Sequence, residues 1–335
     1  MRKMHYVRSA AVSLGLLLGT TCLARADSPP QDNGSIITIQ GENDALSLPS
    51  TDELYTSGER IGYVTPTGVL PDFISRFGGD VFGGGTQRLE FSLGQVIFTP
   101  TNTQLYNPNP RDMPYSAQLA LSTSLIQDTT TMRSVAGLSL GVVGPAALGQ
   151  SVQNGFHELI GQTPNRGWRY QLHDEPTLNL FASRIWRQNI ASLCGGALGL
   201  QVLPQVSGQA GNTEIYAQAG GLVRIGQGLD SDFGPSLLGN GLNGTDAYTP
   251  TRPLVWYVFA GADARLVGHD IFIQGNDFRS SRHVALIPLQ GEAEVGAAMI
   301  LYGMRISATE VFETPQFHHS APAFQYGSIA ISGRF

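Results

Sequence analysis

Hydrophobic and polar residues alternate with a period of two in several separate segments of this chain. Between Tyr115 and Leu125 the odd-numbered positions are mostly apolar, whereas the even-numbered positions are Ser, Gln or Ala. The same alternation runs through residues 135–142 and through residues 324–335, in which Ile329, Ile331 and Phe335 share one face. A period of two predicts strands whose two faces meet different surroundings. One face here is apolar and the other is small or polar, which is typical of strands that separate lipid from a crowded or wet interior.

This pattern divides the chain into twelve predicted strands. They span about residues 36–43, 56–64, 88–98, 114–126, 132–143, 171–186, 192–206, 213–226, 253–266, 289–301, 304–313 and 323–335. An even number suits a bacterial outer-membrane barrel with both termini on one side. We therefore expect an all-β fold, a transmembrane antiparallel β-barrel of about 12 strands, as a single domain over residues 27–335. The alternative is a soluble β-sandwich, against which the long strands and the terminal aromatic Phe335 argue.

One connection between the predicted strands breaks the alternation. Within residues 144–170, the stretch 147–160 predicts an amphipathic helix, because apolar residues recur at spacings of three and four. These apolar residues are Val152, Phe156, Leu159 and Ile160. Gln153 and His157 are four residues apart and lie on a neighbouring face. If both termini face the periplasm, counting strands places this short helix in an extracellular loop.

The first 26 residues predict a signal peptide. Positively charged residues precede an apolar run from Ala10 to Leu23, and Ala24-Arg25-Ala26 provides the small-residue cleavage pattern. A lipoprotein signal with Cys22 as the lipidated residue is the alternative, although Gly19-Thr20-Thr21 fits it poorly. Export of the mature chain, residues 27–335, is expected in either case.

Composition narrows the class of protein further. Residues 27–335 contain 16 arginines and 26 acidic residues, for a net charge of −10, with no lysine and with Cys194 as the only cysteine. An acidic balance disfavours a nucleic-acid partner. Charged residues make up 14% of the whole chain, against about 25% in average globular proteins, and apolar residues are ample, so disorder is disfavoured. No segment of the mature chain has the roughly 18 consecutive apolar residues that a transmembrane helix needs.

Several chemically capable residues are expected to meet at the outer rim of the barrel. Asn43 and Asp44 follow the first predicted strand, Thr56 begins the second, and His157 lies on the predicted helix. A histidine can act as a general base near neutral pH, and carboxylate, amide and hydroxyl oxygens suit Ca²⁺. Taken alone, each residue also has an ordinary explanation, as a turn pair, a strand residue or a surface residue of a helix.

Several short motifs resemble those of the outer-membrane lipid A 3′-O-deacylases. They are Gly41-Glu-Asn-Asp44, Tyr55-Thr-Ser-Gly58, Gly94-Gln-Val-Ile-Phe-Thr-Pro100, Gly141-Val-Val-Gly-Pro145, Gly149-Gln-Ser-Val-Gln-Asn-Gly-Phe-His157 and Gly167-Trp168. The resemblance covers most of the mature chain and is densest between residues 41 and 180. It implies a twelve-stranded barrel with a Ca²⁺-dependent site near the outer rim. Members of this family remove the 3′-linked acyloxyacyl group from lipid A, the anchor of lipopolysaccharide.

The resemblance also implies roles for individual residues. His157 matches the general base, with Asn43, Asp44, Thr56 and Gln153 as its neighbours in the site. Asp44 and Thr56 are the candidate Ca²⁺ ligands. Either the metal or nearby amides would stabilise the oxyanion, and the sequence leaves this division open. The implied partners are lipid A or lipopolysaccharide and the lipids of the outer membrane, with the site facing the cell exterior.

Two departures from the family pattern stand out. Some members carry an acidic residue six positions after the histidine, where this chain has Thr163, although Glu158 and Glu175 are nearby. Some also use a lysine in the loop after the Thr-Pro motif. This mature chain has no lysine, so phosphate contacts would fall to Arg111 or Arg166.

Two other functions remain open from the sequence. The chain fits a passive outer-membrane barrel or small channel, and it fits a Ca²⁺-dependent phospholipase that uses the same histidine. Residues 66–87 are longer than a periplasmic turn needs and have no assigned role. The sequence identifies neither the preferred acyl chain nor the oligomeric state.

Overall fold

The computed structural model describes residues 27–47, 53–318, 320 and 323–335. The predicted signal peptide, residues 1–26, lies outside the described residues. The strands are β1 (Ile36–Asn43), β2 (Leu54–Val64), β3 (Thr86–Thr99), β4 (Ser116–Asp128), β5 (Met132–Val143), β6 (Glu175–Trp186), β7 (Gln188–Leu193), β8 (Leu198–Gly211), β9 (Glu214–Gln227), β10 (Leu254–Asp270), β11 (Leu289–Leu301), β12 (Met304–Glu313) and β13 (Phe324–Arg334). The α-helices are α2 (Asp72–Phe82), α3 (Gly149–Leu159) and α4 (Ile271–Gln274). Short 3₁₀ turns include η1 (Asp44–Leu46), η2 (Pro145–Ala147) and η4 (Cys194–Gly196).

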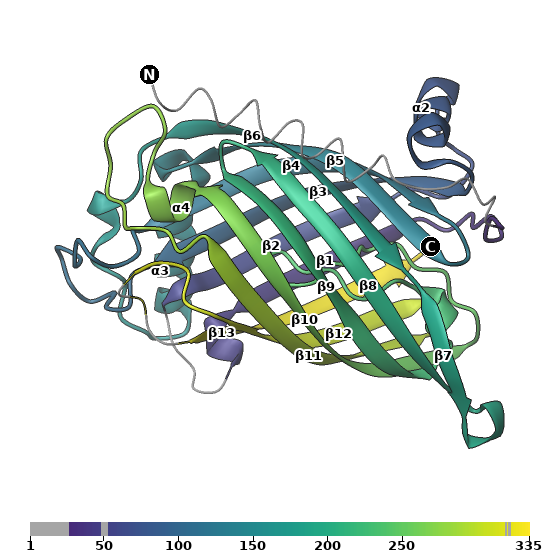
Figure 1. Ribbon diagram of the computed structural model, residues 1–335. Helices are drawn as coiled ribbons and strands as arrows, with labels where there is room; N and C mark the ends of the chain where they lie inside the picture. The colour runs from purple at the N-terminus through teal and green to yellow at the C-terminus, as the bar shows by residue number, and fades with distance from the viewer. Residues whose placement is uncertain (1–26, 48–52, 319, 321–322) are drawn as a thin grey trace.

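The strands form one antiparallel sheet that closes into a barrel (Figure 1). Neighbouring strands pair in sequence order, β1 also pairs with β13, and β6 pairs with β8 to complete the ring. Because β6 and β7 are successive and both pair with β8, they share one position in the wall. The barrel therefore has twelve strand positions, which confirms the predicted fold class. None of the helices in the described part of the chain has the length and apolar character to cross a membrane.

The two ends of the barrel carry different elements. Ile36 at the start of β1 pairs with Arg334 at the end of β13, so we call this end the terminal rim. We call the opposite end, where β1 ends and β2 begins, the loop rim. α3 and α4 lie at the loop rim, whereas α2 lies at the terminal rim (Figure 1). The predicted helix at 147–160 corresponds to η2 and α3.

The alternation read from the sequence separates the inner from the outer face. On β3, Ser92, Gly94 and Val96 line a cavity inside the barrel, whereas Phe91 and Leu93 point outward and are 41% and 46% exposed. The apolar face therefore points away from the barrel axis, as predicted. By the same parity, residues 95, 97 and 99 of β3 belong to the outer face.

A long connection from the terminal rim fills much of the interior. Residues 228–253, which we call the inner loop, run between β9 and β10, and their tip reaches the carboxylate of Glu42 near the loop rim. Glu42 accepts hydrogen bonds from the backbone N–H groups of Leu238 and Gly239, at 2.8 and 2.7 Å. At the base of the inner loop, Arg224 and Asp232 form a buried ion pair at 2.5 Å. The Gly-rich segment 239–244 is the hydrogen-bonded tip of this loop.

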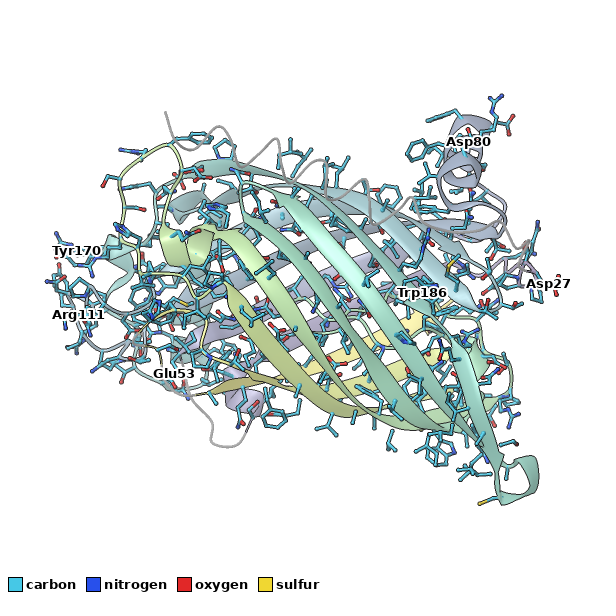
Figure 2. All side chains as sticks on the ribbon, in the orientation of Figure 1. Asp27, Glu53, Asp80, Arg111, Tyr170 and Trp186 are labelled. Carbon is cyan, nitrogen blue, oxygen red and sulfur yellow. The ribbon has the colours of Figure 1, made fainter. Side chains whose placement is uncertain are left out.

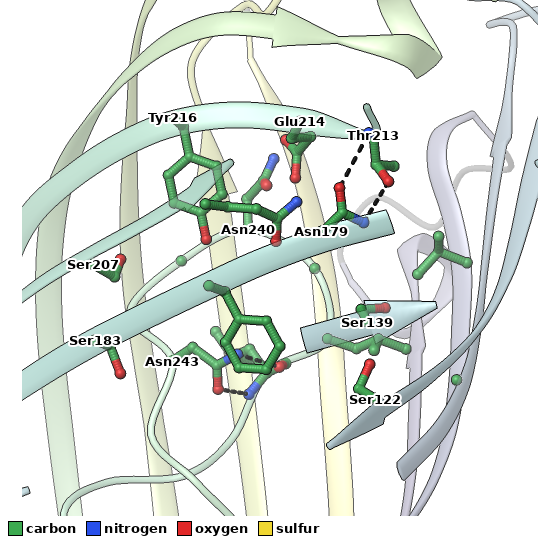
Figure 3. A pocket seen from close by; sticks show the side chains of 18 of the residues that line it. Ser122, Ser139, Asn179, Ser183, Ser207, Thr213, Glu214, Tyr216, Asn240 and Asn243 are labelled. Atoms are coloured by element: carbon green, nitrogen blue, oxygen red, sulfur yellow. Dashed lines mark hydrogen bonds between the residues drawn. The ribbon is translucent and has the colours of Figure 1, made fainter. Parts of the chain in front are cut away.

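A polar cavity of about 300 Å³ remains beside the inner loop. Figure 3 shows serines from several strands around it, together with Asn243 of the inner loop. Asn179 of β6 exchanges hydrogen bonds with Thr213, at 2.6 and 3.1 Å, so polar side chains satisfy one another across the wall. Most residues around this cavity are small or polar, as the pattern of these strands predicts, whereas an apolar cluster that includes Leu203, Leu222 and Phe259 fills another part of the interior.

Most predicted strands agree with the structure, but the region from 171 to 211 differs. The strand predicted at 171–186 begins at Glu175, and the strand predicted at 192–206 is instead the end of β7, a tight turn and β8. Gly195 and Gly196 have φ values of 67° and 95°, a left-handed backbone that glycine adopts without strain, and they turn the chain at this point. All six residues of β7 are exposed, because this hairpin extends beyond the rim (Figure 1).

Candidate active site

Helix α3 packs against the outer face of the barrel wall. A Cβ atom on Gly149 would lie 2.4 Å from the Cβ of Ala117, so the start of the helix touches β4 directly. Ala117 pairs with Ile97 of β3, and both are buried although they share the outer face with exposed Leu93 and Leu121. They belong to one apolar cluster. Its buried members are Ile97, Tyr115, Ala117, Ala147 and Trp168. The connection after β5 therefore folds back over the outside of the wall at the loop rim.

The helix buries the face that carries Gln153 and His157 and exposes a neighbouring apolar face. Gln153 and His157 are only 5% and 7% exposed and lie on the side toward the protein. The apolar residues on the neighbouring face are Val152, Phe156, Leu159 and Ile160, with exposed fractions of 39%, 53%, 81% and 49%. This direction is the reverse of that in a water-soluble protein, where the apolar stripe of a helix faces the core. An apolar layer around the barrel provides a physical reason for it.

The ring of His157 is held by the chain that follows the helix. Its Nδ1 lies 3.2 Å from the backbone carbonyl oxygen of Thr163. A carbonyl only accepts hydrogen bonds, so Nδ1 carries the proton and the neutral ring has its basic lone pair on Nε2. Thr163 is the position at which the resemblance expects an acidic side chain. Here a backbone oxygen at that position orients the imidazole.

Gln153 is oriented by a tryptophan that the sequence analysis gave no role. The indole Nε1–H of Trp168 donates to Gln153 Oε1 at 3.0 Å, which directs the amide NH₂ of Gln153 away from the indole. Trp168 is 1% exposed and packs against Tyr115 with ring centroids 4.9 Å apart. The only sequence signal for this residue was the Gly167-Trp168 motif.

Asn43 and Asp44 form the corner between β1 and the following turn. The Asn43 side-chain oxygen accepts a hydrogen bond from the N–H of Ala45 at 2.7 Å and caps η1. Asp44 is 1% exposed, and its Oδ2 accepts from the N–H of Glu53 at 2.6 Å. Both side chains thus hold the turn that places them at the loop rim.

Thr56 lies in an irregularity of β2, between Tyr55 and Ser57, where the register against β3 shifts. Its hydroxyl lies 2.7 Å from the hydroxyl of Thr99, the last residue of β3. Thr56 and Thr99 are 2% and 0% exposed. A bulge of this kind redirects a side chain at the rim of a barrel.

Strand register brings these separate residues to one level of the wall. Asn43 pairs with Ser57, Ser57 with Ile97, and Ile97 with Ala117. We call these four positions the site row. Neighbouring strands are about 4.8 Å apart, so Asn43 lies about 10 Å from Ile97 along the row. Since α3 covers the Ile97–Ala117 end, the structure places the five predicted site residues at the loop rim.

The remaining charged candidates have other surroundings. Glu158 is exposed. Glu175 lies on the inner face, and its carboxylate accepts hydrogen bonds from the side chain of Asn276 and the N–H of Asp277, so it holds the loop after α4. Arg111 and Arg166 are exposed in the loops of the loop rim, where Arg111 and Tyr170 form its tip in Figure 2. Both arginines are accessible to an anion.

The donor set near Asp44 matches the chemistry of Ca²⁺ only in part. The carboxylate of Asp44 and the hydroxyl of Thr56 are hard oxygen donors, and both side chains are buried at the same rim. Within the described residues, however, no three His, Cys, Asp or Glu side chains are grouped to hold a metal. A site with one carboxylate needs further oxygens from the backbone, water or a ligand, and we expect weak binding.

The closed barrel and its polar residues under a covering helix define an outer-membrane β-barrel protein with a candidate site on its outer wall. The chain belongs to the family described as outer membrane protein LpxR, whose model matches residues 12–335. The structure of LpxR from Salmonella typhimurium is similar, with a TM-score of 0.74 and 23% sequence identity over 90% of this chain and 100% of that chain. The beta domain of the Bordetella autotransporter BrkA is more distant, with a TM-score of 0.43 and 11% identity over 90% of this chain and 98% of that chain. Among curated proteins, none matches this chain.

Proposed function

We propose that this protein is an outer-membrane lipid A 3′-O-deacylase, with His157 as the general base. The observation that carries the proposal is the position of His157, buried between the outer wall and the body of α3, whose neighbouring face is apolar and exposed. A general base that activates water at that position would lie beside the membrane, so that the ester of a membrane lipid could approach it from within the bilayer. Membership of the LpxR family supports the same substrate class.

In the proposed reaction, Nε2 of His157 removes a proton from water, and the water oxygen attacks the carbonyl carbon of the 3′-linked acyl ester. The resulting imidazolium is stabilised by the carbonyl oxygen of Thr163, which accepts from Nδ1–H. When the tetrahedral intermediate collapses, the Nε2 proton passes to the departing sugar oxygen. The products are a free acyloxyacyl acid and a hydroxyl group on lipid A.

The developing oxyanion requires hydrogen-bond donors. Because Gln153 Oε1 accepts from Trp168, its amide NH₂ is the end directed elsewhere and is our first candidate donor. The amide of Asn43 is similarly fixed through its oxygen and is the second. Loss of one such donor typically costs about 10²–10³ in kcat.

Ca²⁺, when bound, would supply a Lewis acid that polarises the ester carbonyl. We propose Asp44 and Thr56 as its ligands in this chain, with the remaining oxygens from other groups. Both residues are held rigidly at the loop rim, Asp44 by the N–H of Glu53 and Thr56 by Thr99. Such support keeps ligand atoms in place before the cation binds.

The substrate would approach along the apolar face of α3. Phe156 and Leu159 are 53% and 81% exposed, and they lie on the same helix as His157. In the proposed orientation the loop rim faces the cell exterior, so this face meets the outer leaflet, where lipid A resides. Arg111 and Arg166, which are exposed at the same rim, would contact its phosphates.

The filled interior weakens the alternative of a passive channel. The inner loop occupies the barrel as far as Glu42, and buried ion pairs such as Arg60–Asp246, at 2.7 Å, hold it there. A phospholipase remains the alternative that a direct assay must separate.

The test combines cells and purified protein. Lipid A from a host that makes the wild-type protein is expected to lose the 3′-acyloxyacyl mass, and the His157→Ala variant is expected to leave lipid A intact. His173→Asn, at an exposed histidine of the same rim, is the matched control. Release of acyl chains from phospholipid instead of lipid A by the purified protein would favour the phospholipase, and conductance without acyl release would favour the channel.

A further inference from the structure

Helix α2 is the element of the terminal rim that the proposed reaction does not use. It lies on the outside of the barrel and runs across the direction of the strands (Figure 1), and Figure 2 labels Asp80 on it. The helix falls within residues 66–87, which are longer than a turn between β2 and β3 requires. The residues that this insertion exposes therefore require a physical explanation.

Two outward-facing glutamines attach this insertion to the wall. Gln87 of β3 and Gln127 of β4 are paired in register and hydrogen-bonded to each other at 2.7 Å. Gln87 also donates to the carbonyl of Ser75 in α2 at 3.1 Å, and Gln127 donates to the carbonyl of Gly83 at 2.6 Å. Gly78 of α2 packs against the side chain of Leu125, an outer residue of β4. The insertion is therefore held against the outside of the barrel, at the terminal rim.

The side of α2 that does not touch the wall carries large apolar side chains. Phe73 and Phe77 are four residues apart, on one face of the helix, and they are 68% and 58% exposed. Gly78 and Phe82 form the buried side. Two phenylalanines exposed on a single short helix expose apolar area that burial would stabilise.

This exposed face continues the apolar outer surface of the barrel. From Gln87 toward the loop rim, the outward positions of β3 are Leu89, Phe91 and Leu93. Phe91 pairs with Tyr63 of β2, and each of the two is 41% exposed. Gln87 and Gln127 thus mark the point where the apolar wall ends and polar residues begin. α2 lies at this boundary, the depth at which aromatic residues of outer-membrane barrels concentrate.

We propose that α2 is an interfacial helix that inserts Phe73 and Phe77 into the phospholipid leaflet at the terminal rim. Its polar residues, Asp72, Arg76 and Asp80, remain at the aqueous side of the headgroups. A helix that lies in the interface with apolar side chains directed into the acyl region fits its placement across the strand direction. The occupant of the face is lipid, and the interaction is independent of the chemistry at His157.

Depth-dependent fluorescence quenching tests the placement. Phe77→Trp and, as a matched control, Asp80→Trp are reconstituted as full-length protein in phosphatidylcholine vesicles, and the emission of the wild-type tryptophans is subtracted. We expect lipids brominated on the acyl chain to quench the added emission of Phe77→Trp severalfold more than that of Asp80→Trp, and aqueous iodide to show the reverse order. Equal quenching of both variants by iodide overturns the proposal. The proposal is also overturned if neither reagent quenches the added emission of Phe77→Trp and this protection depends on protein concentration. A second copy of the protein, and not lipid, would then cover the face.

A second measurement covers the case in which a tryptophan disturbs folding. Hydrogen exchange of residues 72–82 is followed in vesicles for the wild type and for the Phe73→Ser/Phe77→Ser variant, after heat-modified gel mobility has shown that each barrel is folded. We expect faster exchange of α2 in the variant and no change in Phe278→Ser, which alters an exposed phenylalanine at the loop rim. Unchanged exchange of α2 in the double variant overturns the proposal.

Discussion

The Nδ1 atom of His157 lies 3.2 Å from the backbone carbonyl oxygen of Thr163. The contact comes from the main chain, so it orients the imidazole whatever side chain residue 163 carries. It also explains how a chain that lacks the acidic residue expected at this position can still present Nε2 as the basic nitrogen.

Thr163→Ala is therefore expected to keep deacylation within about twofold of wild type, since the Thr163 side chain is exposed and its carbonyl remains. His157→Asn is expected to lose about 10²–10⁴ in kcat, the usual contribution of general base catalysis. Initial rates of acyl release from lipid A in detergent micelles measure both. A large loss in Thr163→Ala would mean that its hydroxyl takes part in the site.

Trp168→Phe removes the N–H donor to Gln153 but keeps an aromatic ring in the apolar cluster. A hydrogen bond contributes about 0.5–1.5 kcal/mol net, so we expect a loss of roughly 2–13-fold in kcat with little change in KM. A positioning role for Trp168 predicts this split, and steady-state kinetics measures it. An equal loss in kcat/KM that came from a higher KM, with kcat unchanged, would contradict the positioning role.

The apolar face of α3 is expected to bind acyl chains. Phe156→Gln/Leu159→Gln should raise KM for lipid A severalfold and leave kcat nearly unchanged, because these side chains lie on a face next to that of His157 and contribute apolar contact area. Tyr302→Gln, at an exposed position of the terminal rim, is the control. Kinetics in mixed micelles distinguishes the two effects, and a fall in kcat alone would count against acyl binding by this face.

Metal removal should abolish activity. With one carboxylate among the candidate ligands, we expect Ca²⁺ affinity in the weak range of about 10⁻⁴–10⁻³ M, so EGTA should inactivate the protein reversibly. Asp44→Asn should raise the Ca²⁺ concentration needed for half-maximal activity. Calcium titrations of both proteins measure this shift. Full activity in excess chelator would exclude the proposed metal.

The carboxyl of Asp32, at the terminal rim, makes the stability of the fold depend on pH in the acidic range. Burial would raise the pKa of its carboxyl, but hydrogen bonds from Arg334, the backbone of Gly34, Arg88 and Thr249 outweigh this effect and hold the pKa well below its ordinary value. A carboxyl with a lower pKa in the folded state stabilises the fold above its unfolded pKa, about 3.9, and this stabilisation is lost as pH falls through the folded pKa.

Asp32→Asn should therefore lower the free energy of unfolding by about 3 kcal/mol at pH 7, and the difference from wild type should shrink as the pH falls below about 4. Denaturant unfolding in vesicles, followed by tryptophan fluorescence, measures the difference at each pH. Asp80→Asn, at an exposed carboxyl, should match wild type. A pH-independent difference would show that charge is not the cause.

Much of the barrel was predictable from local pattern. The strands at 36–43, 132–143, 289–301 and 304–313 match their predictions residue for residue, because each strand separates two different environments and its own alternation records them. The short helix was predictable from its spacing of three and four. The turn at Gly195–Gly196 was missed, because the flanking residues keep strand character on both sides.

For the candidate site, the sequence indicated which residues to consider but not how they are arranged. Motifs singled out His157, Gln153, Asn43, Asp44 and Thr56 as candidates, but the site row that aligns Asn43 with Ala117 depends on the register of four strands. The bond from Trp168 to Gln153 depends on how the loop after α3 returns to the wall. Neither relationship has a local signature.

The sequence by itself determined the elements, the two-faced character of the wall and the polar and apolar sides of α3, since these follow from the order of neighbouring residues. Only the tertiary structure decided that α3 turns the side with Gln153 and His157 to the barrel, that the inner loop reaches Glu42, and that α2 lies against the outside of β3 and β4. Periodicity defines the faces of an element, whereas the surroundings that each face meets depend on contacts between residues far apart in the chain.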